Sequence, residues 1–209
     1  MNIHIFYDIF ARLFRTRRMH KFQKLFGLVS KNHVLDVGGT PFNWSMLSER
    51  PKLTILNLSF PRRREKTVWW IVADGRYLPF KDKVFDIVFS NSMIEHLGNF
   101  DNQYLFSTEC YRVGHGYYVQ TPNKWFPIEP HLITPFIHWV GRKIQKKLLR
   151  NFTVWGLITR PTRQKCDKLM QEICLLNKQE MSVLFPEAEI WRERFLGLTK
   201  SLIAVKTSQ

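Results

Sequence analysis

The stretch that decides the fold is His33-Val34-Leu35-Asp36-Val37-Gly38-Gly39-Thr40-Pro41-Phe42-Asn43. A short apolar run rich in β-branched residues ends here at a glycine pair, which predicts a buried strand over 33–37 and then a tight turn. The dinucleotide fingerprint GxGxxG is absent, and Pro41 lacks the backbone donor that a pyrophosphate cradle would use. The stretch therefore favours a ligand without phosphates over NAD.

The rest of the chain continues the pattern in both directions. Further strands are predicted over 53–58, 68–73, 84–89 and 116–120, and helices over 3–28, 43–48, 102–112 and 177–185. Near-continuous apolar strands that alternate with helices indicate parallel βαβ units. Residues 189–195 and 200–205 predict an antiparallel hairpin. We therefore predict a doubly wound, Rossmann-like α/β fold: a mostly parallel seven-stranded sheet with a C-terminal hairpin and helices on both faces.

The chain has 209 residues, which suits one α/β domain. We expect an amphipathic helix over residues 1–30 that packs on a domain over residues 31–209. Residues 121–165 are the least regular part, rich in Pro, Trp, Phe and basic residues. They are predicted to form an insertion or lid on the ligand side of the sheet.

The formal net charge is +15, and basic residues gather in the ranges 12–24, 62–66 and 142–150. Such a surface attracts nucleic acid, anionic lipid or acidic small molecules, or it is simply solvated. No run of apolar residues predicts a transmembrane helix, and the N-terminus lacks the pattern of a signal peptide. We expect a cytoplasmic protein, with peripheral membrane association as an alternative.

The three cysteines, Cys110, Cys166 and Cys174, form no CxxC pair, and no cluster of ligands predicts a metal site.

Polar residues and glycine follow the predicted strands at their carboxyl ends, where doubly wound sheets bind ligands. Asn57 lies 19 positions after Gly38, close to the spacing of a ribose-binding acid. Asp74, followed by Gly75, offers a carboxylate to an exocyclic amine such as that of adenine, or forms a common turn. Ser90 and Asn91 leave the fourth predicted strand.

Glu95 and His96 follow in the next turn, where they act as acid and base or, as we favour, only anchor the turn.

The segments Val34–Gly39, Ala73–Phe80 and Phe85–Leu97 closely resemble class I S-adenosylmethionine-dependent methyltransferases of the type 11 family. By this resemblance the cofactor is S-adenosylmethionine. Gly38 and Gly39 would contact its methionine part, Asn57 its ribose, and Asp74 with Gly75 its adenine. Ser90 and Asn91 would lie near the sulfonium, while Asp36 would orient the first loop and the cofactor amine. Two features depart from the family pattern: Thr40-Pro41-Phe42 stands in place of further glycines, and Asn57 stands in place of the ribose-binding acid.

The segment 121–131, which includes Pro127-Ile128-Glu129-Pro130-His131, follows the fifth predicted strand. The type 11 family has a similar block, and by position it would line the acceptor pocket. Glu129 or His131, and less directly His96, would then take a proton from an acceptor hydroxyl or amine. The alternative is a rigid loop set by prolines, in which Glu129 and His131 only bind backbone groups.

Four functional hypotheses remain open. The first is a methyltransferase that acts on a small-molecule, sugar-like or lipid-linked acceptor. The second is an RNA methyltransferase, which the net charge favours and the lack of a base-modifying motif disfavours. The third is a non-catalytic binding module that keeps the methyltransferase fold, motivated by the first loop and by Asn57. The fourth is a peripheral membrane protein that uses the basic range 12–24 and the range 132–150.

Overall fold

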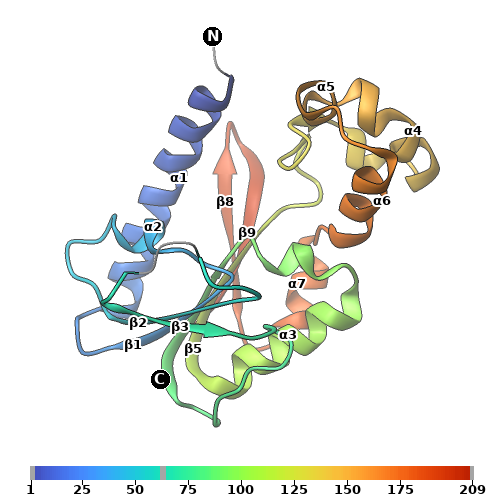
Figure 1. Cartoon of the computed structure of the whole chain (residues 1–209). Coiled ribbons are helices and arrows are strands. Elements are labelled where there is room, and N and C mark those ends of the chain that lie inside the picture. Colours follow the sequence, from blue (N-terminus) through green and yellow to red (C-terminus); the bar gives the residue numbers. More distant parts are fainter. Residues whose placement is uncertain (1–2, 62–64, 208–209) are drawn as a thin grey trace. The chain divides into compact units, whose positions relative to one another are not determined.

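The computed structural model describes residues 3–61 and 65–207 (Figure 1). Its main helices are α1 (Ile3–Phe26), α2 (Pro41–Trp44), α3 (Phe100–Val113), α4 (Arg142–Phe152), α5 (Val154–Thr159), α6 (Arg163–Glu172) and α7 (Lys178–Leu184). The long strands are β1 (His33–Val37), β2 (Lys52–Asn57), β3 (Val68–Val72), β4 (Phe85–Asn91), β5 (Gly114–Pro122), β8 (Glu189–Phe195) and β9 (Leu198–Lys206). Short elements are the 3-10 helices η1 (Ile94–Leu97) and η2 (Ile137–Trp139) and the pair β6 (Ile128–Glu129) and β7 (Thr134–Pro135).

The seven long strands form one sheet in the order β3-β2-β1-β4-β5-β9-β8. Strand β1 pairs in parallel with β2 and β4, and β2 pairs in parallel with β3. Strands β8 and β9 pair antiparallel, with a register shift between Glu193 and Arg194. The predicted fold class, a mostly parallel seven-stranded sheet with a C-terminal hairpin, is therefore confirmed.

Two compact units make up the chain. Unit 1 comprises residues 1–91, 109–118 and 206–209, and unit 2 comprises residues 92–108 and 119–205. The predicted division into residues 1–30 and 31–209, with 121–165 as a lid, stays a proposal.

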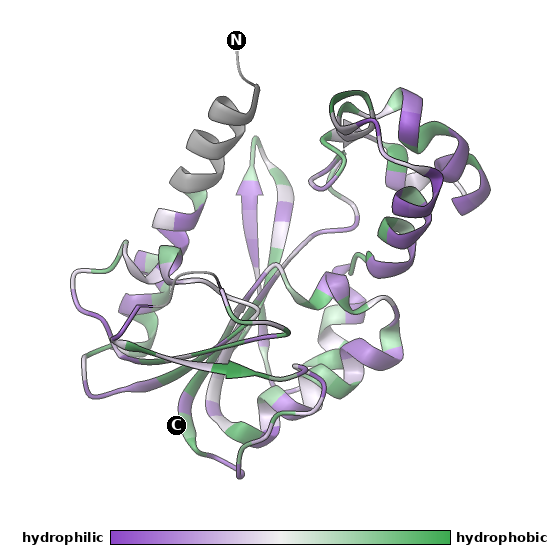
Figure 2. Cartoon of the chain, in the orientation of Figure 1, coloured by the Kyte–Doolittle hydropathy of each residue, from purple (hydrophilic) through white to green (hydrophobic). Residues whose placement is uncertain are grey.

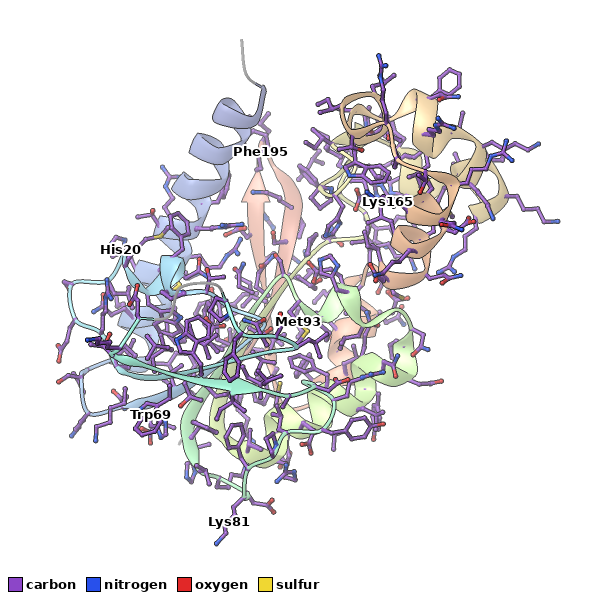
Figure 3. All side chains as sticks on the ribbon, viewed as in Figure 1. His20, Trp69, Lys81, Met93, Lys165 and Phe195 are labelled. Atoms are coloured by element: carbon purple, nitrogen blue, oxygen red, sulfur yellow. The ribbon has the colours of Figure 1, made fainter. Side chains whose placement is uncertain are left out.

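An aromatic cluster anchors helix α1 in unit 1. Phe22 of α1 is fully buried, and its ring lies 5.0 Å from that of Phe89 on β4, 5.2 Å from that of Tyr118 on β5 and 5.9 Å from that of Trp44 on α2. Aromatic pairs at these spacings stabilise a core beyond the area that they bury. Strand β3 lies at the edge of the sheet, and its Trp69 is largely exposed (Figure 3).

The helix predicted over 43–48 begins and ends earlier, at Pro41 and Trp44. Pro41 occupies the first turn, where its fixed φ suits a helix and its missing N–H costs nothing. The cluster Arg62-Arg63-Arg64 lies outside the described residues, as do the side chains of residues 1–13 in the first predicted helix.

The predicted irregular segment 121–165 is more regular than expected, because it holds β6, β7, η2, α4 and α5. Within unit 2, Leu149 of α4 packs with Leu132, Ile137 and Cys166 in a small core. Figure 2 shows hydrophilic and hydrophobic stretches alternating along α4 and α6, as expected for helices with one buried face.

Candidate functional site

The turn after β1 in unit 1 leaves no space for a side chain at Gly39. A Cβ at this position would lie 1.8 Å from Asp36 Oδ2. Asp36 is fully buried and accepts a hydrogen bond of 2.8 Å from Trp44 Nε1. Gly38 adopts φ +78°, a left-handed conformation that glycine adopts without steric strain. The glycine pair is therefore required by both space and conformation.

Two side chains tie the neighbouring strands to this turn. Asn57, at the end of β2, donates from Nδ2 to the carbonyl oxygen of Gly39 at 2.8 Å. Ser90, fully buried near the end of β4, donates from Oγ to the carbonyl oxygen of Val37 at 3.0 Å. The structure thus brings Asp36, Gly39, Asn57 and Ser90 together at the carboxyl ends of β1, β2 and β4.

Asp36 is an unusual buried acid. Burial raises its pKa to about 7, although the hydrogen bond from Trp44 opposes this shift. Among the described residues its Oδ1 atom has no hydrogen-bond partner. A buried acceptor without a partner is costly unless a ligand or water satisfies it. Asp36 is therefore the best candidate in unit 1 to receive a donor group from a ligand.

Asp74 follows β3 and is held by Arg76. Arg76 donates to both carboxylate oxygens, with Nη2 2.6 Å from Oδ2 and Nε 3.0 Å from Oδ1. Its backbone N–H also donates to Oδ1. These bonds lower the pKa of Asp74, so it is ionised at neutral pH. A carboxylate has about four acceptor positions, so Asp74 retains capacity for a ligand amine. Gly75 beside it is buried.

Asn91, the last residue of β4, has a partner that the sequence analysis missed. Its Oδ1 accepts a hydrogen bond from the guanidinium of Arg18 on α1. Arg18 is buried, although we assigned it by sequence to a surface cluster of basic residues. The signal was available, because Arg18 lies four positions before the buried Phe22 and next to the buried Met19.

Unit 2 brings the three predicted acid-base residues together. His131 Nδ1 lies 2.7 Å from Glu129 Oε1, and His131 Nε2 lies 3.2 Å from His96 Nε2. Burial acts to lower the pKa of His131, but the hydrogen bond and charge of Glu129 outweigh it and raise this pKa. Partial desolvation of its ring and the charge of His131 lower the pKa of His96, although the residue as a whole is exposed. The pair can therefore hold one proton between two rings.

Glu95 joins this cluster from the turn after β4, where Met93 precedes η1 (Figure 3). It is fully buried, and burial raises its pKa to about 7. Ligand atoms of Glu95, His96 and His131 all lie within 4.8 Å of one another, an arrangement that can hold a metal ion. We expected no such cluster from the sequence, because His131 is distant along the chain and only folding brings it to His96.

A cavity of about 340 Å³ also lies in unit 2. Its lining is mostly apolar, with Leu132, Leu149 and Met170, and carries the charged groups of Lys124, Glu129 and Arg142. This volume is at the lower end of the range for small-molecule sites.

In the described part of the chain, no helix is long and apolar enough to cross a membrane.

Comparison with known families supports the assignment made from the motifs. A family model described as a methyltransferase domain matches residues 50–116. Comparison with curated proteins gave no match.

Solved structures share the fold at low identity. A structure from Rhodobacter sphaeroides, named for zinc-dependent alcohol dehydrogenases, has a TM-score of 0.61 at 13% identity, covering 92% of this chain and 89% of its own. A phosphoethanolamine N-methyltransferase of Haemonchus contortus was solved in complex with phosphomonomethylethanolamine and S-adenosylhomocysteine. It has a TM-score of 0.53 at 13% identity, covering 84% of this chain and 38% of its own. A chain from the Haloferax volcanii complex of a methyltransferase with its Trm112 activator has a TM-score of 0.50 at 13% identity, covering 97% of both chains.

At these identities the structural likeness establishes the fold. The methyltransferase match supports S-adenosylmethionine as the cofactor. Residues 50–116 match the family model of a methyltransferase domain, and this range holds the Ala73–Phe80 and Phe85–Leu97 motifs that resemble the type 11 family.

Proposed function

We propose that this protein transfers a methyl group from S-adenosylmethionine to a small-molecule, sugar-like or lipid-linked acceptor. The observation that carries the proposal is the turn after β1. There the fully buried Asp36 has an oxygen without a partner among the described residues, beside a glycine that no other residue can replace. Such a turn fits a cofactor that brings an amine and lies close to backbone.

The residues of unit 1 suit the separate parts of this cofactor. Gly38 and Gly39 would contact its methionine part, with Asp36 near the amine. Asn57 would face the ribose; its Nδ2 is already bound to Gly39, which leaves Oδ1 to accept from a hydroxyl. Asp74 and Gly75 would hold adenine, and Ser90 and Asn91 would lie near the sulfonium.

When bound, the cofactor supplies an activated methyl group, so the protein mainly has to align the acceptor and keep water out. An acceptor hydroxyl or amine must also lose a proton. We propose that His131, oriented by Glu129, takes this proton and shares it with His96. The cavity of unit 2, which Glu129 lines, has a suitable size for the acceptor.

Asp74→Ala is expected to weaken binding of S-adenosylmethionine at least ten-fold, about 1.4 kcal/mol, because adenine loses its acceptor. Calorimetry on both proteins measures this effect. The control is Asp101→Ala, which removes an exposed carboxylate in the first turn of α3 and should leave affinity unchanged. Equal affinity in the wild type and Asp74→Ala would show that adenine lies elsewhere. An absence of binding by the wild type would favour the non-catalytic binding module.

A second candidate role, association with an anionic lipid surface, rests on helix α4. Its Ile144 and Phe152 are 53% and 69% exposed, and Lys143 and Lys147 are exposed on the same helix. Interleaved cations and exposed apolar side chains are typical of helices that lie on membranes. RNA offers phosphates for the lysines but no apolar layer for Ile144 and Phe152.

Vesicle sedimentation tests this second role. Vesicles rich in phosphatidylserine should pellet the protein at low salt, and Lys143→Glu with Lys147→Glu should weaken the association ten-fold or more, since each lysine contributes about 1 kcal/mol. The matched control is Lys165→Glu with Lys178→Glu, which reverses the charge of two lysines that are exposed on α6 and α7. Binding to RNA with a steep salt dependence, without binding to vesicles, would contradict the lipid surface and favour the RNA alternative.

A further inference from the structure

We propose that Glu95, His96 and His131 bind a divalent transition-metal cation in unit 2. Each side chain offers one ligand atom, and these atoms all lie within 4.8 Å of one another. Two imidazoles and one carboxylate are a ligand set that zinc and related metals use in catalytic sites. The cation site does not depend on the proposed methyl transfer.

The distance between the two imidazoles fits a shared metal ion. His96 Nε2 and His131 Nε2 are 3.2 Å apart. Two nitrogen ligands at a zinc–nitrogen distance of about 2.05 Å and a tetrahedral angle are separated by about 3.3 Å. The rings also lie nearly perpendicular, at an interplanar angle of 89°. Both nitrogens can therefore face one cation with little rearrangement.

Glu95 gives an independent indication of a missing ligand. It is fully buried, and Thr121 Oγ1 donates to its Oε2 at 2.9 Å. In the described part of the chain, no donor reaches its Oε1. A buried carboxylate oxygen in this state is costly unless a cation or a proton satisfies it. A bound metal would satisfy Oε1 and allow Glu95 to ionise.

Glu129 has the position of an outer partner that orients a metal-binding histidine. Its Oε1 lies 2.7 Å from His131 Nδ1, and its Oε2 accepts from the backbone N–H of Leu132. When Nδ1–H donates to a carboxylate, a neutral imidazole presents its lone pair at Nε2. This is the carboxylate–histidine–metal arrangement common at metal centres. Glu129 therefore prepares His131 to coordinate through Nε2.

The site is open on one side, because His96 is exposed. Three protein ligands and solvent access leave a coordination position for water or for a substrate hydroxyl, as in catalytic zinc sites. A cation there would lower the pKa of a bound hydroxyl. It would also occupy both Nε2 lone pairs, so His131 cannot accept a proton while the metal is bound. A bound metal ion and a proton on His131 Nε2 therefore exclude each other at this site.

The experiment titrates Zn²⁺, Co²⁺ and Mg²⁺ separately into the full chain, after treatment with a chelator, and follows heat and the visible spectrum of Co²⁺. We expect one equivalent of Zn²⁺ or Co²⁺ to bind at micromolar concentration or below, with cobalt bands typical of four or five ligands. Mg²⁺ should bind far more weakly, because it prefers oxygen ligands. His96→Ala and His131→Ala should each weaken Zn²⁺ binding at least ten-fold, and Glu129→Gln ten- to 100-fold.

His115→Ala is the matched control, because it removes an exposed histidine of unit 1 and should not change metal affinity. His96 is also exposed, so His96→Ala should keep the fold, which an unchanged melting temperature verifies. The proposal is overturned if the wild type binds no stoichiometric Zn²⁺, or if His96→Ala and His131→Ala bind it as tightly as His115→Ala. Binding of S-adenosylmethionine, measured without metal, tests the proposed function separately, because the residues predicted to bind this cofactor lie in unit 1.

Discussion

Gly39→Ala is expected to abolish measurable binding of S-adenosylmethionine and to destabilise unit 1 by about 1–3 kcal/mol, the usual cost of overpacking. The new Cβ would lie 1.8 Å from Asp36 Oδ2 and 2.0 Å from Asp36 Cγ. Asp36 has no space to retreat, because it is fully buried and bonded to Trp44. The turn must therefore move, and the hydrogen bond from Asn57 to the Gly39 carbonyl moves with it.

Calorimetry with S-adenosylmethionine and urea unfolding measure the two effects. Gly141→Ala is the control, because a Cβ at Gly141 meets no atom within 4 Å. Removing the obstructing side chain gives a second control: Gly39→Ala should cost less stability in an Asp36→Ala background than alone, a coupling that a double-mutant cycle detects. Unchanged cofactor affinity in Gly39→Ala would place the cofactor away from this turn.

Local sequence patterns were sufficient to predict the sheet and one side of the candidate site. Strand β1 appears at its predicted bounds because its apolar run stops at two glycines. Candidate cofactor residues lie at the carboxyl ends of successive parallel strands, so the strand order already places Asp36, Asn57 and Ser90 near one another. These positions follow from periodicity and topology, which a single sequence carries.

Contacts that depend on the direction of individual side chains were not predictable in the same way. Arg76 reaches back to Asp74 by a geometry that no periodicity reports. His131 lies 35 positions after His96, and the Glu129 carboxylate orients it only once β6 and β7 pair. Strand β5 also extends through Thr121, which turns a residue of the predicted loop into a hydrogen-bond donor to Glu95. A metal site can therefore emerge from residues that the sequence presents only as separate candidates for acid-base chemistry.

Phe22→Ala is expected to lower the free energy of unfolding by about 3–5 kcal/mol, the usual cost of truncating a buried phenylalanine to alanine. Phe22 is fully buried, and its ring is within 5.9 Å of the rings of Trp44, Phe89 and Tyr118. Truncation removes helix α1's contact with α2 and two strands at once, and leaves a cavity that these large rings cannot readily fill.

Urea unfolding followed by circular dichroism measures this loss, and Phe152→Ala, which truncates a largely exposed phenylalanine of α4, should change stability by less than about 0.5 kcal/mol. The comparison also tests the proposal that the N-terminal helix packs on the domain. If Phe22→Ala costs no more than Phe152→Ala, α1 is an appendage and its Arg18 does not support the end of β4. A large loss instead makes α1 part of the core, so that the contact from Arg18 to Asn91 belongs to the framework that positions the end of β4.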